Sequence, residues 1–216
     1  MTYTVYGAVG SGSVIVEAAL TLMGVPYRIE EIVTYESEAE RRRMAPHNPM
    51  RQVPALVTAQ GETLTESAAI LLWLTEQHPE ANLAPPPGDP RRGQFLRWLN
   101  FIPAAIYPMY WVRDVPSRLV GDDEAAQGRI RARTAERIAH CWGVMEGQVD
   151  PGRFILGDTL TVLDLYVAVA SRWTPSRTRF HQIAPRLGQV ARRVAALPAL
   201  ADFWSRRFPF EGNYVG

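Results

Sequence analysis

The stretch RQVPALVTAQGETLTESAAILLWL, residues 51–74, contains two short β-prone runs and the start of a helix. The runs at 55–58 and 63–65 flank Gln60-Gly61, a turn signal that favours a hairpin. Residues 66–77 follow with apolar side chains at helical spacing and end before a His-Pro pair. This stretch therefore predicts a strand–strand–helix unit.

The residues before this unit predict a strand, a helix and a second strand. Residues 2–6 alternate and are β-prone, and a Gly/Ser-rich loop at 7–13 leads into a helix with Val14, Ala18 and Leu22 on one stripe. Gly24 is placed to end that helix, and residues 26–33 form the second strand. Such a βαβ unit favours parallel pairing of its strands. A short irregular helix is expected at 36–44.

Strand signals mostly stop at LAPPPGDP, residues 83–90, where three consecutive prolines favour an extended connector. The helices expected beyond it cover about 95–106, bent at Pro103 and Pro108, then 130–145, a segment from 161 to 170 that is apolar nearly all round, 185–197 and 200–206. The predicted organisation is a βαβ–ββα domain at 1–80, a linker at 81–90 and an all-helical domain at 91–216.

Composition limits the classes of function. The chain has 216 residues, a formal net charge of +1 and one cysteine, Cys141, which lies on an apolar helical stripe. Neither nucleic acid nor a membrane is an expected partner, because there is no strong net charge, recognition motif or long apolar run. The four histidines, listed as His47, His78, His140 and His181, show no metal-binding spacing, so no metal is expected. The single cysteine and the absence of a signal-peptide pattern favour a cytoplasmic location.

Pro54 stands at the start of a predicted strand, where its missing N–H does not break a ladder. A trans bond is the simple interpretation, because only about 5–6% of X-Pro bonds in folded proteins are cis. A cis bond would instead turn the main chain of Val53 outward, where an extended peptide could pair with it.

Glu66-Ser67 stands where the next helix begins. Backbone N–H groups at a helix start attract carboxylates, so Ser67 could hold a carboxylate while Glu66 accepts from an ammonium group. Together the two residues suit the α-amino-acid end of a ligand. The alternative is that Thr65 or Glu66 caps the helix and nothing binds there.

The motifs QVPAL and LTESAAI resemble the glutathione-site pair of the cytosolic glutathione transferases. GDTLTVLDLYVA, residues 157–168, resembles the buried capping box of that family, with Thr161 as the cap and Asp164 bonding back to it. The three motifs occur in the family's order along the whole chain. The resemblance implies a thioredoxin-like N-terminal domain followed by an all-helical C-terminal domain, and a homodimer.

The resemblance also implies a ligand, the tripeptide thiol glutathione, as co-substrate. It favours the cis form of Pro54, pairs Val53 with the cysteinyl main chain, and assigns Glu66 and Ser67 to the γ-glutamyl group. Gln52 occupies the slot whose side chain reaches toward the glycyl carboxylate. Arg51 departs from the small residue frequent in the preceding slot, so it either obstructs the site or adds a positive charge beside that carboxylate.

The group that activates the thiol is expected in GSGS, residues 10–13, at the start of the first helix, whose dipole favours a thiolate. Relatives use a tyrosine, serine or cysteine in this region. Here no cysteine is present, and Tyr3 and Tyr6 lie within the predicted strand, which leaves Ser11 and Ser13. We favour Ser11 as the catalytic donor, with Ser13 as a second contact to glutathione or as the helix N-cap.

Four residues follow the expected bent helix, namely Tyr107, Tyr110, Trp111 and Arg113. Because that helix lines the pocket for the hydrophobic co-substrate in relatives, the resemblance makes these residues candidates for such a pocket. The aromatic side chains could equally be core or dimer contacts. The predicted function is a transferase that binds glutathione, stabilises its thiolate and directs it at a hydrophobic electrophile. The alternative is a non-catalytic module of the same fold that binds a ligand or a protein.

Overall fold

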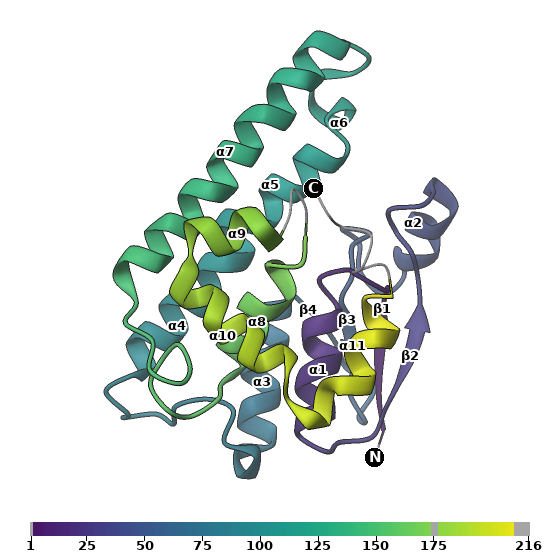
Figure 1. Cartoon of the computed structure of the whole chain (residues 1–216). Coiled ribbons are helices and arrows are strands. Elements are labelled where there is room, and N and C mark those ends of the chain that lie inside the picture. The colour runs from purple at the N-terminus through teal and green to yellow at the C-terminus, as the bar shows by residue number, and fades with distance from the viewer. Residues whose placement is uncertain (1, 174–176, 210–216) are drawn as a thin grey trace.

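The computed structural model describes residues 2–173 and 177–209. Figure 1 shows a small sheet with its helices on one side of the molecule and a larger group of helices on the other. The first part consists of β1 (Tyr3–Gly7), α1 (Val14–Leu22), β2 (Tyr27–Glu31), α2 (Glu38–Met44), β3 (Ala55–Val57), β4 (Thr63–Thr65), α3 (Ser67–Gln77) and the 3₁₀ turn η1 (Pro79–Ala81). These elements follow the predicted order.

The sheet has the strand order β2-β1-β3-β4. β1 pairs with β2 in parallel and with β3 in antiparallel fashion, so that Val5 lies opposite both Ile29 and Leu56. β3 and β4 form the expected hairpin. Val5 and Leu56 are buried, because side chains on one face of a strand pair enter the same core. The predicted βαβ–ββα arrangement is confirmed.

The second part is helical in the residues that the structure describes. It consists of α4 (Arg92–Phe101), η2 (Ile102–Ile106), α5 (Tyr107–Asp114), α6 (Ser117–Val120), α7 (Glu124–Gln148), α8 (Val162–Ala170), α9 (Arg177–Ile183), α10 (Pro185–Ala195), η3 (Pro198–Leu200) and α11 (Ala201–Arg207). The short helices α6 and α9 are not predicted from the sequence. Residues 174–176 and 210–216 of the expected helical domain lie outside the described residues.

The expected bent helix is a continuous helical segment with one irregular turn. η2 is a π-helical turn in which the Tyr107 N–H donates to the Ile102 carbonyl. Pro103 lies in this turn and Pro108 in the first turn of α5, and neither has an N–H to continue the regular ladder. The irregular turn thus separates α4 from the aromatic helix α5. None of the helices in the described part of the chain combines the length and apolarity of a membrane span.

α8 is buried along its whole length and packs against α1, α4 and α10. The predicted capping box at its start is confirmed. The Asp164 carboxylate accepts from the Thr161 N–H at 2.7 Å and also from the Ile155 N–H at 2.8 Å. This carboxylate therefore joins the preceding loop to the first turn of α8. One apolar core extends from the sheet and α1 through α8 into the helical part.

The last residue of β1 lies very close to the first turn of α1. A Cβ on Gly7 would lie 2.5 Å from Ser13 Oγ, 2.8 Å from Ser13 Cβ and 3.2 Å from a Glu17 carboxylate oxygen. Both of these side chains are fully buried. Only a glycine leaves room for this close approach of strand and helix.

We expect Asp164→Ala to lower the free energy of unfolding by about 3 kcal/mol, because two buried N–H groups lose their acceptor at about 1–3 kcal/mol each. Denaturant unfolding measures this change. The matched control is Asp123→Ala, which removes the exposed N-cap of α7 and should cost about 1 kcal/mol. Equal losses of unfolding free energy in the two variants would contradict the larger contribution that we assign to the buried capping box.

We expect Gly7→Ala and Gly128→Ala to change stability in opposite directions. The first forces a Cβ against Ser13 and destabilises the fold. The second adds a Cβ in open space on the exposed side of α7 and should stabilise the chain by up to about 1 kcal/mol. Thermal unfolding of both variants tests this, and a neutral Gly7→Ala would mean that the strand and helix can separate at no cost.

Candidate active site

The loop between β1 and α1, residues 8–13, is held by three segments that are distant in sequence. Trp173 Nε1 donates to the Gly10 carbonyl at 2.8 Å, and the Gly10 N–H donates to the Arg207 carbonyl at 2.8 Å. The Tyr35 hydroxyl donates to the Val9 carbonyl at 3.0 Å. The loop conformation therefore depends on the helical part as well as on the sheet.

Ser11 lies at the meeting point of two cavities. One has a volume of about 510 Å³ and the other about 450 Å³, and Ser11, Gly12, Tyr35 and Tyr107 line both. The Ser11 hydroxyl is 2.8 Å from the Ala8 carbonyl, to which it can donate. It also accepts from the Ser13 N–H at 3.2 Å. The hydroxyl that we expect to activate a thiol is thus held in place from the protein side of the cavity.

Ser13 is fully buried below Ser11 and is not among the described residues that line either cavity. The structure does not bring its side chain to the place expected of a glutathione contact. Ser13 occupies the N-cap position of α1 but makes no side-chain capping bond. Its hydroxyl instead accepts from the Ala8 N–H at 3.0 Å and lies 2.9 Å from Ser11 Oγ.

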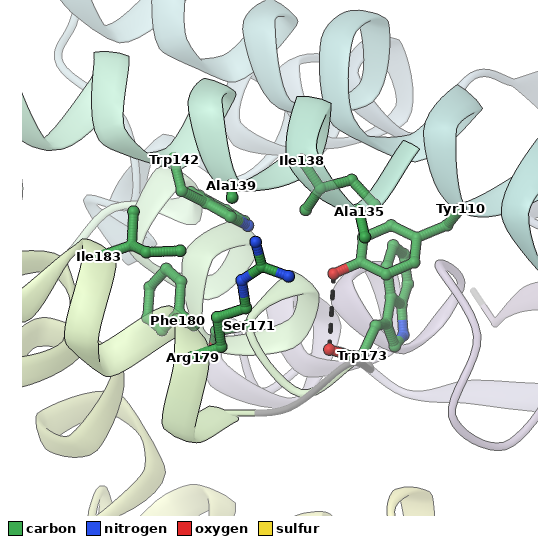
Figure 2. Close-up of a pocket in the computed structure, with 10 residues that line it drawn as sticks. All are labelled: Tyr110, Ala135, Ile138, Ala139, Trp142, Ser171, Trp173, Arg179, Phe180 and Ile183. Carbon is green, nitrogen blue, oxygen red and sulfur yellow. Dashed lines mark hydrogen bonds between the residues drawn. The ribbon is translucent and has the colours of Figure 1, made fainter. Parts of the chain in front are cut away.

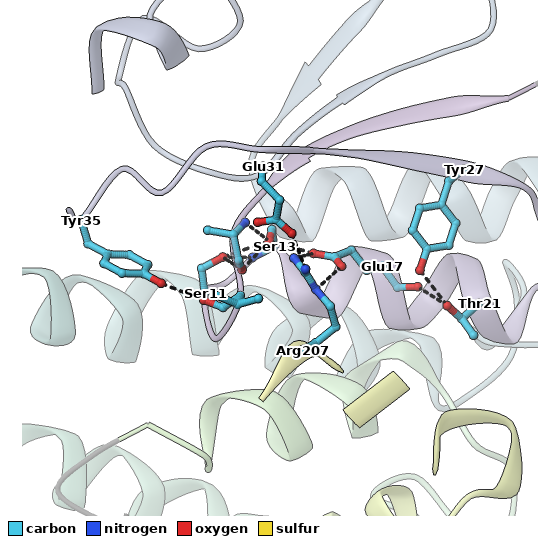
Figure 3. Close-up of polar contacts among 10 residues, drawn as sticks. Ser11, Ser13, Glu17, Thr21, Tyr27, Glu31, Tyr35 and Arg207 are labelled. Carbon is cyan, nitrogen blue, oxygen red and sulfur yellow. Dashed lines mark hydrogen bonds and ion pairs between the residues drawn. The ribbon is translucent and has the colours of Figure 1, made fainter. Parts of the chain in front are cut away.

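A buried carboxylate lies next to Ser13. Ser13 Oγ donates to Glu17 Oε1 at 3.0 Å, as Figure 3 shows. Arg207 of α11 donates to Oε1 at 2.9 Å, and its Nε lies 2.6 Å from Oε2. Arg207 also pairs with Glu31 of β2. Burial raises the pKa of Glu17 to about 7, although the charge of Arg207 and the Ser13 hydrogen bond act in the opposite direction.

The peptide bond between Val53 and Pro54 is cis, as the resemblance implied. Gln52, Val53 and Pro54 all line the larger of the two Ser11 cavities. The Gln52 carbonyl accepts from Asn48 Nδ2 at 2.9 Å, which fixes the chain just before the cis bond. Val53 is thereby held at the wall of the same cavity as Ser11.

Glu66 and Ser67 line this cavity too. Glu66 has φ 64° and ψ 105°, and it makes no capping bond although it occupies the N-cap position of α3. The simple capping interpretation of its carboxylate is therefore wrong. Ser67 is buried, and its hydroxyl lies 2.6 Å from the hydroxyl of Tyr166 in α8.

Arg51 is not among the described residues that line the larger Ser11 cavity. Its guanidinium pairs with Glu38 of α2 at 2.7 Å. It borders an adjoining cavity with Gln52 and with two further arginines, Arg41 and Arg118. Its charge lies at the edge of this adjoining cavity, where the Glu38 carboxylate pairs with it.

The four candidate co-substrate residues divide between the cavities. Tyr107 lines both Ser11 cavities, Tyr110 lines the smaller and Trp111 the larger. Arg113 is not among the described lining residues of either one, and its guanidinium lies 5.9 Å from the centre of the Tyr110 ring. Tyr107 also packs edge-on against Trp173, which closes the smaller cavity from the helical side.

A separate pocket lies behind Tyr110 and Trp173, between α5, α7 and α9 (Figure 2). Figure 2 shows the guanidinium of Arg179 pointing into it from α9. Its volume is only about 20 Å³, which is room for about one water molecule. We therefore do not assign a substrate to it.

Four residues around the site were not identified from the sequence, namely Glu17, Tyr166, Trp173 and Arg207. Glu17 does have a sequence signal, because it is a lone acid in the apolar segment VIVEAAL, four residues after Ser13 on the same helical face. The other three approach from distant segments and carry no local signal. Within residues 2–173 and 177–209 no cluster of three or more potential metal-binding side chains is found.

Comparisons with known proteins show the family of the chain. The family model described as the N-terminal domain of glutathione S-transferases matches residues 13–77. An uncharacterized GST-like protein of Escherichia coli strain K12, YncG, is 32% identical over 203 residues, which cover 94% of this chain and 97% of that protein. A maleylpyruvate isomerase from a Ralstonia species is 35% identical over 156 residues, or 69% of this chain and 71% of that protein.

The fold also resembles that of a solved glutathione S-transferase. The solved structure of a sphingomonad glutathione S-transferase complexed with glutathione superposes with a TM-score of 0.75 at 25% identity, over 97% of this chain and 98% of that one. The chain accordingly has a thioredoxin-like N-terminal domain followed by a helical part. Because the similarity to the E. coli protein covers nearly all of both chains, this chain belongs to the glutathione S-transferase family.

Proposed function

We propose that the protein is a glutathione transferase that binds glutathione in the larger Ser11 cavity and a hydrophobic electrophile in the smaller one. The observation that carries this proposal is the position of Ser11, which lines both cavities. A glutathione thiol bound beside Ser11 would therefore lie next to the cavity that holds the electrophile. The protein then contributes orientation and stabilisation of charge, while the bound thiol is the nucleophile.

In the larger cavity, the main chain of Val53 would pair with the cysteinyl main chain, and Gln52 would face the glycyl end. Glu66 would accept from the ammonium of the γ-glutamyl group and Ser67 would hold its carboxylate. The contact between Ser67 and Tyr166 supports the second assignment. If the Tyr166 hydroxyl donates to Ser67, the Ser67 hydrogen is free to donate to a carboxylate.

Activation of the thiol needs only a modest energy. A thiol with a pKa of about 8.5 is only about 3% ionised at pH 7. A shift of about two pKa units requires roughly 2.7 kcal/mol of preferential thiolate stabilisation. One or two hydrogen bonds to the charged sulfur, each of about 1.5–3 kcal/mol, would supply it, and the Ser11 hydroxyl is the donor that we assign.

The electrophile would lie against Tyr107, Tyr110 and Trp173 in the smaller cavity, with Trp111 at the edge of the larger one. Asp114 and Arg172 also line the smaller cavity, so one part of it suits a polar group on the electrophile. The relative named as a maleylpyruvate isomerase favours one second candidate reaction. A thiolate that adds to an unsaturated acid and is then eliminated gives an isomerisation at the same site.

We also propose a homodimer, which the family resemblance implies, and a cytoplasmic location, which the single cysteine favours. Light scattering of the purified chain tests the oligomeric state. A non-catalytic binding module of the same fold would retain the dimer but would not shift the pKa of bound glutathione.

We expect Ser11→Ala to return the thiol pKa of bound glutathione from a depressed value toward about 8.5, because the thiolate loses its donor. The ultraviolet absorbance of the thiolate against pH measures this pKa. Ser205→Ala, which removes an exposed hydroxyl that bonds the Asp202 carbonyl of its own helix, is the control. A depressed pKa in Ser11→Ala would move the role to the backbone or Ser13, and an unshifted pKa in the parent would leave only the binding module.

We expect Ser67→Ala to weaken glutathione binding by about tenfold or more, because a hydrogen bond to a charged group is worth about 1.5–3 kcal/mol. Tyr166→Phe should weaken it less, since Ser67 keeps its own hydroxyl. Calorimetry gives both affinities. With a glutathione analogue that lacks the γ-glutamyl α-carboxylate, the variants and the parent should bind alike. If the variants lose as much affinity for the analogue as they lose for glutathione, the γ-glutamyl carboxylate does not bind at Ser67.

A further inference from the structure

Beneath the thiol site lies a continuous chain of polar groups that glutathione binding does not itself require. It runs from Ser11 Oγ to Ser13 Oγ over 2.9 Å, and from Ser13 Oγ to Glu17 Oε1 over 3.0 Å (Figure 3). Ser11 borders both cavities, whereas Ser13 and Glu17 are fully buried. The chain therefore connects the surface of the cavity to a carboxylate without direct access to solvent.

The hydrogen-bond partners fix the direction of the hydroxyl hydrogens when Glu17 is ionised. Ser13 accepts from the Ala8 N–H, and an ionised Glu17 carboxylate at 3.0 Å is a stronger acceptor for its hydrogen than the Ala8 carbonyl at 3.3 Å. Ser11 donates inward, to Ser13 Oγ or to the Ala8 carbonyl, and accepts from the Ser13 N–H. In this state the Ser11 oxygen has a lone pair left for an incoming thiol, but its hydrogen does not face the cavity.

We propose that Glu17 accepts the thiol proton of glutathione through the hydroxyl groups of Ser11 and Ser13. This inference rests on the proposed function. The S–H bond breaks and its proton joins Ser11 Oγ, the Ser11 proton passes to Ser13 Oγ, and the Ser13 proton passes to Glu17 Oε1. Each hydroxyl loses one proton and gains one, so the products are a thiolate and a neutral Glu17 carboxyl group.

The transfer also leaves the hydroxyl groups in the orientation that a thiolate needs. Once protonated, Glu17 donates to Ser13 and Ser13 donates to Ser11. Ser11 then has its own hydrogen, the one received from the thiol, directed at the sulfur. One event thus removes the proton and creates the hydrogen bond that stabilises the thiolate.

The surroundings of Glu17 suit a proton acceptor that works near neutral pH. Arg207 from α11 faces it directly, Glu31 from β2 faces Arg207, and the Tyr27 hydroxyl of β2 reaches Thr21 one turn away on α1. Burial brings the pKa of Glu17 to about 7, close to that of a thiol. Of the partners that the structure describes for this carboxylate, Ser13 alone can both receive and pass on a proton, because an arginine stays protonated.

Counting protons tests the relay on the full chain. Binding of glutathione is measured by calorimetry in buffers of different ionisation enthalpy, which gives the protons released. Thiolate absorbance of the same samples gives the thiolate formed, and S-methylglutathione corrects for protons that do not come from the thiol. Near pH 7 we expect clearly less than one proton released per thiolate. The deficit should vanish as the pH falls well below 7, because Glu17 then already holds its proton.

Two variants and a matched control separate the relay from a structural role. Ser13→Ala interrupts the chain but keeps the pair between Glu17 and Arg207, and Glu17→Gln removes the acceptor. In both, each thiolate that forms should release one proton. In Glu17→Gln the thiolate can persist, since an amide can orient the same hydroxyls. Glu31→Gln removes the exposed carboxylate on the same arginine and should keep the deficit of the parent.

One proton released per thiolate in the parent at pH 7 would overturn the relay and leave the transferase proposal intact. The same holds if Ser13→Ala and Glu17→Gln both retain the deficit of the parent. If the parent binds no glutathione or forms no thiolate, the proposed function fails and the relay fails with it.

Discussion

The buried carboxylate of Asp164 sets the position of α8, and the arrangement of the site follows from that helix. Asp164 joins the Ile155 N–H to the start of α8, so the helix begins at a defined residue and with a defined rotation. Because α8 is apolar on every side, packing alone would specify its rotation only weakly. With its start fixed, α8 directs Tyr166 at Ser67, and the chain beyond it directs Trp173 at Gly10.

Both parts of the chain therefore determine the conformation of the loop that presents Ser11. Trp173 and Arg207 come from the helical part, and both bond the backbone of Gly10. Figure 1 shows α11, which ends in Arg207, lying beside α1. Hydrogen bonds to the loop backbone leave the Ser11 side chain at the cavity while they restrict its position. The geometry of this loop therefore depends on the helical part of the chain.

The close approach of β1 and α1 also affects the protonation of the Glu17 carboxylate. Gly7 lets Ser13 and Glu17 pack directly against the strand, which excludes water from the carboxylate. Arg207 offsets part of the cost of burying that charge, and the remaining penalty is expressed as a raised pKa. A group that would be a fully ionised acid at the surface thus becomes one that can exchange a proton near neutrality.

Short-range patterns in the sequence were enough to predict the order of the strands and of most helices, the hairpin at Gln60-Gly61 and the capping box at Thr161 and Asp164. These features depend on residues that are neighbours along the chain, so the spacing of these residues can be read directly from the sequence. The cis bond before Pro54 could be expected only from the resemblance to a family. The short helices α6 and α9 were missed, because neither is long enough to show a period.

The roles of the individual side chains were decided by contacts across long sequence separations. The sequence left both serines as candidates and favoured Ser11, and the fold turns Ser11 to the cavity and buries Ser13 against Glu17. Arg51 pairs with Glu38 and is not among the described residues that line the cavity containing Val53. The partners of Glu17 and Ser67 are Arg207 and Tyr166, which only tertiary packing brings near. Hydrogen-bond direction and burial are properties of the assembled neighbourhood, so no local pattern could have determined them.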